Sequence, residues 1–202
     1  MASPKLNFDL NRFYETLVTS ASHKHLFTAV TLVDGGPLGA MSRTLKAYAD
    51  VGIPDSDVFP VGVLYHDIAV MLGFDDRIWN EYFYPAMAKL PKDNDDFKEM
   101  IRGFNAVASG KHGNPCLPKQ GGEWDASITT LIAKAGMRLY VCNNATHGFA
   151  NFIAKTLKHD ATAVYKDMAA HLVPNAMLVP AGVWAVHAIQ EQRFTLLEIS
   201  LA

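Results

Sequence analysis

The stretch from Arg138 to Asn144, RLYVCNN, decides the fold class because it turns from a strand pattern into a helix pattern. Its apolar residues are typical of a short buried strand, and two asparagines follow where a helix can begin. Apolar residues then recur at helical spacing, at Phe149, Phe152, Ile153 and Leu157. The sequence therefore predicts a strand over Arg138–Val141 and a helix beginning at Asn143 or Asn144.

The same order of strand and then helix recurs along the chain. Val58–Tyr65 is almost continuously apolar, as a strand covered on both faces must be, and Pro60 predicts that its pairing begins near Val61. Further strands are predicted over His25–Val33, Ala176–Val179 and Phe194–Ile199. Helices are predicted near Phe8–Val18, from Leu38 to Gly52, after the caps Asp75 and Asp160, from Ile128 to a stop at Gly136, and over Gly182–Gln192.

This alternation predicts an α/β fold: a single domain over residues 1–202 with a mostly parallel central sheet of about five strands and helices on both faces. The N-terminal helix, about 8–18, and a long insertion, about 83–123, are additions to that core. Glycines and prolines gather between Gly103 and Gly122 in the insertion. We expect this part to lie over the site or at a subunit contact, and to be mobile.

Composition excludes two classes of partner. Lys and Arg number 18 against 20 Asp and Glu, and no basic stripe is present, so nucleic acid is not an expected partner. No apolar run approaches the roughly 20 residues that cross a bilayer, so no membrane association is expected. The chain as given predicts a cytoplasmic protein, or a periplasmic one if a leader was removed before Met1.

Ligands of open parallel sheets bind at the carboxyl ends of the strands. In this sequence those ends carry His66, the run Cys142–Asn144 and the run Pro180–Gly182, which we expect at one edge of the sheet. Neither GxGxxG after a strand nor GxxxxGK[ST] occurs, so no phosphate-binding motif is present. Asn143, Asn144, Gly182 and Trp184 are the candidate ligand-binding residues.

Cys142 is the sharpest catalytic candidate. Between a strand and a helix N-terminus, backbone N–H groups and the helix dipole stabilise a thiolate. The alternative is a small apolar residue of the sheet, since free cysteine is often buried. His66 has the same two interpretations: a general base or ligand at the edge, or a core histidine bonded to a backbone carbonyl.

Two further histidines suggest a metal or haem site. His23 and His25 are two residues apart, so on an extended chain they point to the same side. A third ligand, such as His66 or His112, has to come from elsewhere. The cofactor is therefore unknown: a sulfur-handling protein needs none, whereas a ligand-binding protein could hold haem or a metal.

Three stretches resemble the DsrE/DsrF-like family, in particular its uncharacterised DsrE-like subgroup. They are LYVCNNATHG from Leu139 to Gly148, LVPAGVWAVH from Leu178 to His187, and HKHLF from His23 to Phe27. The resemblance implies a small α/β domain with a central parallel sheet, assembled as a homo-oligomer. In sulfur-relay members of the family a cysteine carries a persulfide, and Cys142 falls on that position.

Two functional hypotheses follow. The first is a sulfur-handling protein, a persulfide carrier with Cys142 as nucleophile and His66 as neighbouring base, exchanging sulfur with a donor and an acceptor. The alternative is a small-molecule or cofactor-binding protein, with haem or a metal held by His66 or His25. The long insertion favours a covered pocket more than a simple protein-to-protein relay does.

Overall fold

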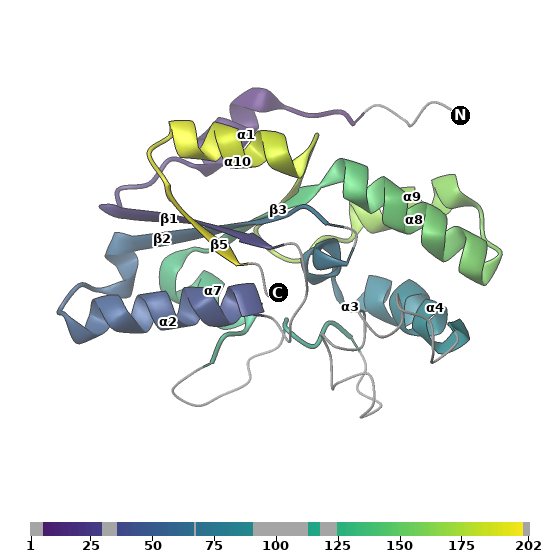
Figure 1. Cartoon of the computed structure of the whole chain (residues 1–202), viewed down its shortest axis with the longest axis horizontal. Helices are drawn as coiled ribbons and strands as arrows, with labels where there is room; N and C mark the ends of the chain where they lie inside the picture. Colours follow the sequence, from purple (N-terminus) through teal and green to yellow (C-terminus); the bar gives the residue numbers. More distant parts are fainter. Residues whose placement is uncertain (1–5, 30–35, 67, 91–112, 118–124, 200–202) are drawn as a thin grey trace.

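The computed structural model describes residues 6–29, 36–66, 68–90, 113–117 and 125–199. Its centre is a five-stranded, all-parallel sheet in the order β4-β3-β2-β1-β5 (Figure 1). The strands are β1 His23–Ala29, β2 Val58–Leu64, β3 Arg138–Cys142, β4 Ala176–Val179 and β5 Thr195–Ile199. The predicted α/β architecture with one parallel sheet is confirmed.

Helices cover both faces of the sheet, as predicted. α1 and α10 lie on one face, and α2 and α7 lie on the other (Figure 1). The helix bounds are α1 Leu10–Thr16, α2 Gly36–Asp50, α3 Asp76–Ile78, α4 Tyr84–Lys89, α7 Ile128–Ala135, α8 Asn143–Leu157, α9 Ala161–Ala170 and α10 Gly182–Glu191. Short 3₁₀ turns occupy Asp55–Asp57 and Ala69–Gly73, and a π turn over Trp79–Phe83 joins α3 to α4.

Alternation of side chains along the strands divides the core into two parts. Leu26, Val61 and Tyr140 pack with residues of α1 and α10. Phe27 and Leu139, one residue out of step with them, belong to the larger part beneath α2, α7 and α8. Both faces of the central strands are therefore buried, which explains why β2 is a continuous apolar run in the sequence.

Three helix ends lie at the capping and stop residues that the sequence predicts. The Asp75 carboxylate accepts from the backbone N–H groups of Arg77 and Ile78, and the Asp160 carboxylate caps α9 at Ala163 N in the same way. α7 ends at Gly136, whose φ of 62° is left-handed and suits glycine. The predicted caps and the predicted stop are confirmed.

The predicted start of pairing near Val61 is wrong for β1 but holds for β3. The strand begins at Val58 and includes Pro60, which stands opposite His25 of β1. Pairing with β3, on the other side, begins only at Val61 opposite Arg138. Pro60 therefore lies where β2 has one neighbour, so its missing N–H removes no bond to β3.

The predicted insertion begins as helix, since α4 continues to Lys89. Most of Gly103–Gly122 lies outside the described residues, and so does the expectation about its position and mobility. Its described part, residues 113–117, is anchored by the buried Asn114, which bonds to the backbone at Leu72 and Phe74.

Among the described helices, none combines the length and the apolar character needed to span a bilayer.

Candidate functional site

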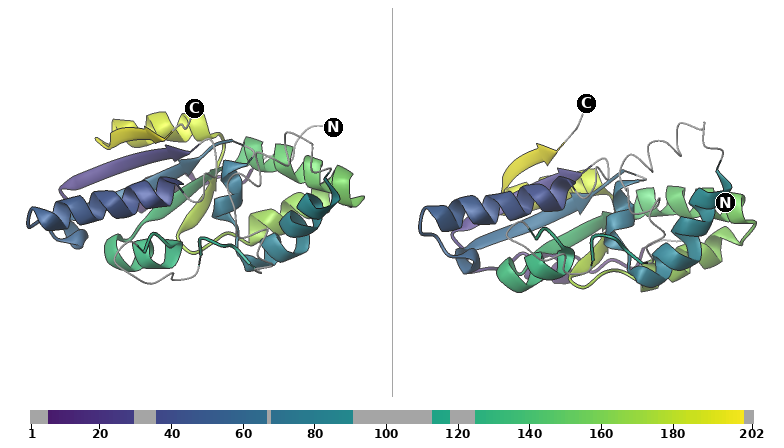
Figure 2. Two further views of the ribbon diagram at one scale, coloured as in Figure 1. Left: turned by 60° about the horizontal axis from the view of Figure 1, so that its bottom comes forward. Right: turned by 90° about the horizontal axis from the view of Figure 1, so that it is seen from below.

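The strand ends expected to form a site do meet at one edge of the sheet. Cys142 pairs in register with Val179 of β4, and the preceding Val141 pairs with Leu64 of β2. Cys142 therefore lies between the ends of β2 and β4. The strands run toward the side of the molecule that holds α8 and α9 (Figure 2).

Cys142 is both the last residue of β3 and the N-cap of α8. Its Sγ accepts the backbone N–H of Ala145 at 3.4 Å, and its carbonyl oxygen accepts the Thr146 hydroxyl at 2.9 Å. The side chain is 5% exposed. Strand pairing and these two bonds hold the sulfur at the N-terminus of α8, beside a backbone N–H group.

Asn143 is buried and attaches α8 to α9. Its Oδ1 accepts the Tyr165 hydroxyl at 2.7 Å, and the Tyr165 ring stacks on His147 with centroids 3.6 Å apart. Burial raises the pKa of Tyr165, so the phenol stays protonated as the donor. The predicted ligand-binding residue Asn143 is thus engaged within the protein, whereas Asn144 is exposed.

His66 is exposed just beyond the end of β2. Its carbonyl oxygen accepts the backbone N–H of Val70, which starts the 3₁₀ turn. Within the described parts of the chain, no hydrogen bond joins the His66 side chain to Cys142. The structure therefore brings the two predicted catalytic residues to one edge without a direct bond between them.

Tyr65 occupies the space next to Gly182 at this edge. A Cβ built on Gly182 would lie 1.9 Å from the Tyr65 Cβ, so only glycine fits there. Burial, and then the negative charge of Glu198, raise the pKa of Tyr65. This contact accounts for a glycine at position 182, and ligand binding at Gly182 stays a prediction. No local pattern marked Tyr65, because its neighbour is far away in sequence.

Trp184, a predicted ligand-binding residue, packs against the α1 segment. Its ring contacts Phe8 edge-on at 5.4 Å and Phe13 at 5.1 Å between centroids. These contacts attach the α1 segment to α10, and Trp184 is partly buried against the core on this face of the sheet.

His23 and His25 lie at the start of β1, at the opposite end of the sheet from Cys142. The two rings contact Tyr48 on the same face, as the spacing predicts. His25 is held on both nitrogens, with Nδ1 2.8 Å from the Thr195 hydroxyl and Nε2 2.9 Å from the Tyr48 hydroxyl. The described residues contain no group of three side chains arranged to ligate a metal.

These two hydrogen bonds select the tautomer of neutral His25 that carries its proton on Nδ1. The Thr195 hydroxyl donates to the Lys24 carbonyl, so it accepts from Nδ1–H, and Nε2 then accepts from Tyr48. Burial, and then the charge of His23, hold the pKa of His25 below its ordinary value. A metal could bind Nε2 only by displacing Tyr48.

We expect the free energy of unfolding to fall between about pH 7.5 and about pH 5.5, partly because of His25. The unfolded chain takes up a proton there and the folded His25 resists it, so stability present at higher pH is lost as the pH falls. Urea unfolding of His25→Gln should show a weaker pH dependence than the parent. His187→Gln, at an exposed histidine of α10, is the control; equal slopes for the parent and His25→Gln would contradict the assignment.

Comparisons of the chain with family models, with curated proteins and with solved structures find no match. The site is therefore interpreted from its own geometry, in which the central feature is a cysteine sulfur held between the end of β3 and the start of α8.

Proposed function

We propose that this protein handles sulfur as a persulfide carrier through Cys142. The observation that carries the proposal is the Cys142 Sγ accepting the Ala145 N–H at the N-terminus of α8, at the end of a central strand. The resemblance of LYVCNNATHG to the DsrE/DsrF-like family supports the same residue. So does the parallel sheet that the resemblance implies.

In the proposed reaction, the Cys142 thiolate attacks the outer sulfur of a donor persulfide, R–S–SH. The new S–S bond forms on Cys142 as the donor S–S bond breaks, and the donor leaves as R–S⁻. An acceptor thiolate then attacks the outer sulfur and releases the Cys142 thiolate. His66, exposed at the same edge, is the proposed base for the thiol proton.

Burial of Cys142 favours a small donor. With 5% of the side chain exposed, a bulky protein thiol has little access, whereas a short polysulfide chain needs only a narrow opening. Inorganic polysulfide is therefore the probe of choice.

Cys116 provides a matched control because it is also 5% exposed but lies in a short irregular segment. We expect the native protein to gain sulfur on Cys142 and to pass it to a small thiol. Cys142→Ser should lose this activity, and Cys116→Ser should keep it. Intact-mass and peptide mass spectrometry locate the added sulfur. Equal loading of both cysteines, or none before unfolding, would overturn the proposal.

The alternative function is binding of a small molecule or cofactor, with haem or a metal at His66 or His25. The absorption spectrum and native mass of protein purified from cells distinguish the two hypotheses. A bound haem or metal lost in His66→Ala or His25→Ala would favour the alternative. Added sulfur that disappears in Cys142→Ser would favour sulfur handling.

A homo-oligomer remains part of the proposal, and β5 is the surface at which we expect contact. This edge strand pairs with β1 on one side, and its Leu196 and Leu197 are 42% and 49% exposed on opposite faces. Exposed apolar edge strands commonly pair with another chain. Sedimentation should show a larger species that Leu197→Lys dissociates; a monomeric parent would contradict this.

A further inference from the structure

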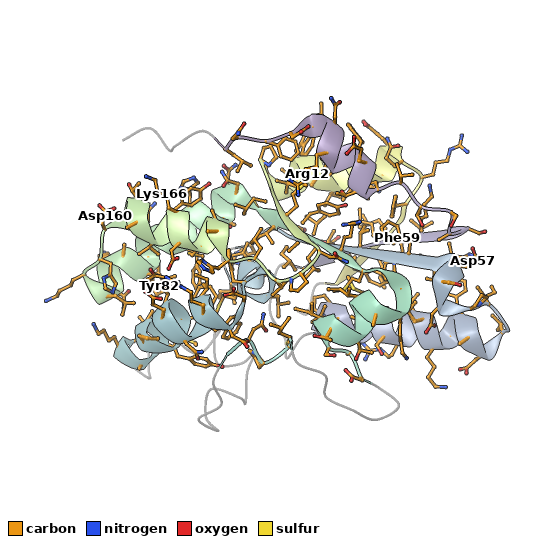
Figure 3. All side chains as sticks on the ribbon, turned by 180° about the vertical axis from the view of Figure 1, so that it is seen from behind. Arg12, Asp57, Phe59, Tyr82, Asp160 and Lys166 are labelled. Carbon is orange, nitrogen blue, oxygen red and sulfur yellow. The ribbon has the colours of Figure 1, made fainter. Side chains whose placement is uncertain are left out.

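A second polar site lies at the end of the sheet opposite to Cys142. A pocket of about 210 Å³ opens where β3 and β4 begin, beneath α1. Arg138 and Asn175 line it from the sheet side, and Arg12 and Thr16 line it from α1. Figure 3 shows Arg12 where α1 lies over the sheet.

The charge in this pocket is uncompensated within the described parts of the chain. No carboxylate lines the pocket, and neither Arg12 nor Arg138 forms an ion pair with a described residue. The α1 segment carries two acids, Asp9 and Glu15, and neither lines the pocket. Asp9 caps the helix by accepting the Arg12 backbone N–H, and Glu15 lines a different hollow. Arg12 and Arg138 bring two positive charges to the lining of one pocket, and an anion between them would lower their mutual repulsion.

The neutral groups of the pocket are fixed by internal hydrogen bonds. The Thr16 hydroxyl donates to the Phe13 carbonyl at 2.6 Å, so the Tyr140 hydroxyl donates to Thr16 at 2.8 Å. Burial raises the pKa of Tyr140 to about 12, so it adds no negative charge at neutral pH. Asn175 uses one Nδ2 hydrogen on the Met137 carbonyl, and no other described residue accepts its second. Among the described side chains that line the pocket, the donors left for a ligand are those of the two arginines and one amide N–H.

We propose that this pocket binds a small oxyanion with two negative charges, held between Arg12 of α1 and Arg138 of β3. Guanidinium groups match the oxygens of phosphate and carboxylate groups in pairs, and two of them balance a dianion. The volume is smaller than most ligand pockets, which fits a phosphate group or a short dicarboxylate rather than a nucleotide. Because the ligand would bridge α1 and the sheet, it should also strengthen the attachment of α1.

The test uses the full chain with inorganic phosphate and, separately, succinate, both at constant ionic strength set with sodium chloride. We expect calorimetric binding of at least one of them and a rise in Tm that chloride does not reproduce. Arg12→Gln and Arg138→Gln should each weaken binding about tenfold or more, as expected for loss of a charge-assisted contact. Arg43→Gln, which removes an equal charge from an exposed position on α2, should bind like the parent.

Two variants keep the test decisive if one is poorly folded, since Arg12 is exposed on α1 and Arg138 lies in the sheet. Binding of phosphate alone or succinate alone would support the site and identify which anionic group it prefers. Failure of the parent to bind either anion, or equal binding by the parent, Arg12→Gln and Arg138→Gln, would overturn the proposal. The persulfide chemistry of Cys142 does not enter these measurements, so the two proposals fail independently.

Discussion

Replacing Gly182 with alanine should lower the free energy of unfolding by about 3 kcal/mol. The added Cβ would lie 1.9 Å from the Tyr65 Cβ and 3.0 Å from the Tyr65 Cα. Neither atom is the end of a flexible side chain, so α10 or the end of β2 must move. Urea unfolding, with circular dichroism as the signal, measures the change.

Substitutions of Tyr65 test whether its contact with position 182 causes the loss of stability. Tyr65→Ala keeps the Cβ and should not relieve Gly182→Ala, whereas in a Tyr65→Gly background the same change should cost much less. Gly39→Ala is the control, because the nearest described atom to its Cβ would belong to the flexible Arg43 guanidinium, at 3.4 Å, inside a helix that alanine favours. Parent-like stability of Gly182→Ala would show that this contact does not constrain the edge.

The parallel sheet could be predicted because its signals are local. In the run RLYVCNN, the apolar strand and the polar helix start are adjacent in sequence, and Asp75 and Gly136 mark helix ends in the same way. The start of pairing with β1, at Val58, could not be predicted, because Pro60 lies where β2 pairs with β1 alone. Which residues of a strand have neighbours on both sides depends on the whole sheet.

The candidate site was predictable only in part, for the same reason. The position of Cys142 follows from one strand and one helix. Its surroundings depend on distant contacts: Tyr65 against Gly182, and Tyr165 bonded to Asn143. Trp184 likewise finds its partners in the α1 segment, which its position two residues after Gly182 could not indicate.

The arginine pocket had no signal in the sequence at all. Thr16 and Tyr140, which meet in it, are 124 residues apart, and Arg12 and Arg138 each look like ordinary charged residues of a helix and a strand. Only the packing of α1 on the start of β3 brings them together. A sequence with no basic stripe can therefore still hold a compact cationic site.

Replacing Asn114 with alanine should also lower the free energy of unfolding by about 3 kcal/mol. The residue is 1% exposed. Its Nδ2 donates to the carbonyls of Leu72 at 3.2 Å and Phe74 at 2.7 Å, and its Oδ1 accepts the Cys116 N–H at 2.9 Å. Truncation removes all three bonds and leaves buried backbone groups unsatisfied. Urea unfolding of the variant and the parent measures the loss.

Asn80→Ala is a matched variant that measures the cost of losing one hydrogen bond at an exposed position, for comparison with the buried Asn114. Asn80 is exposed and accepts the Gly113 N–H at 2.8 Å, so Asn80→Ala removes one bond to the same segment and should cost about 1 kcal/mol or less.

Because Asn114 holds the backbone of Cys116, Asn114→Ala should also speed alkylation of Cys116 in the native protein more than that of Cys142, which is fixed separately by α8. Equal acceleration at both cysteines would mean that Asn114 stabilises the whole domain rather than this segment.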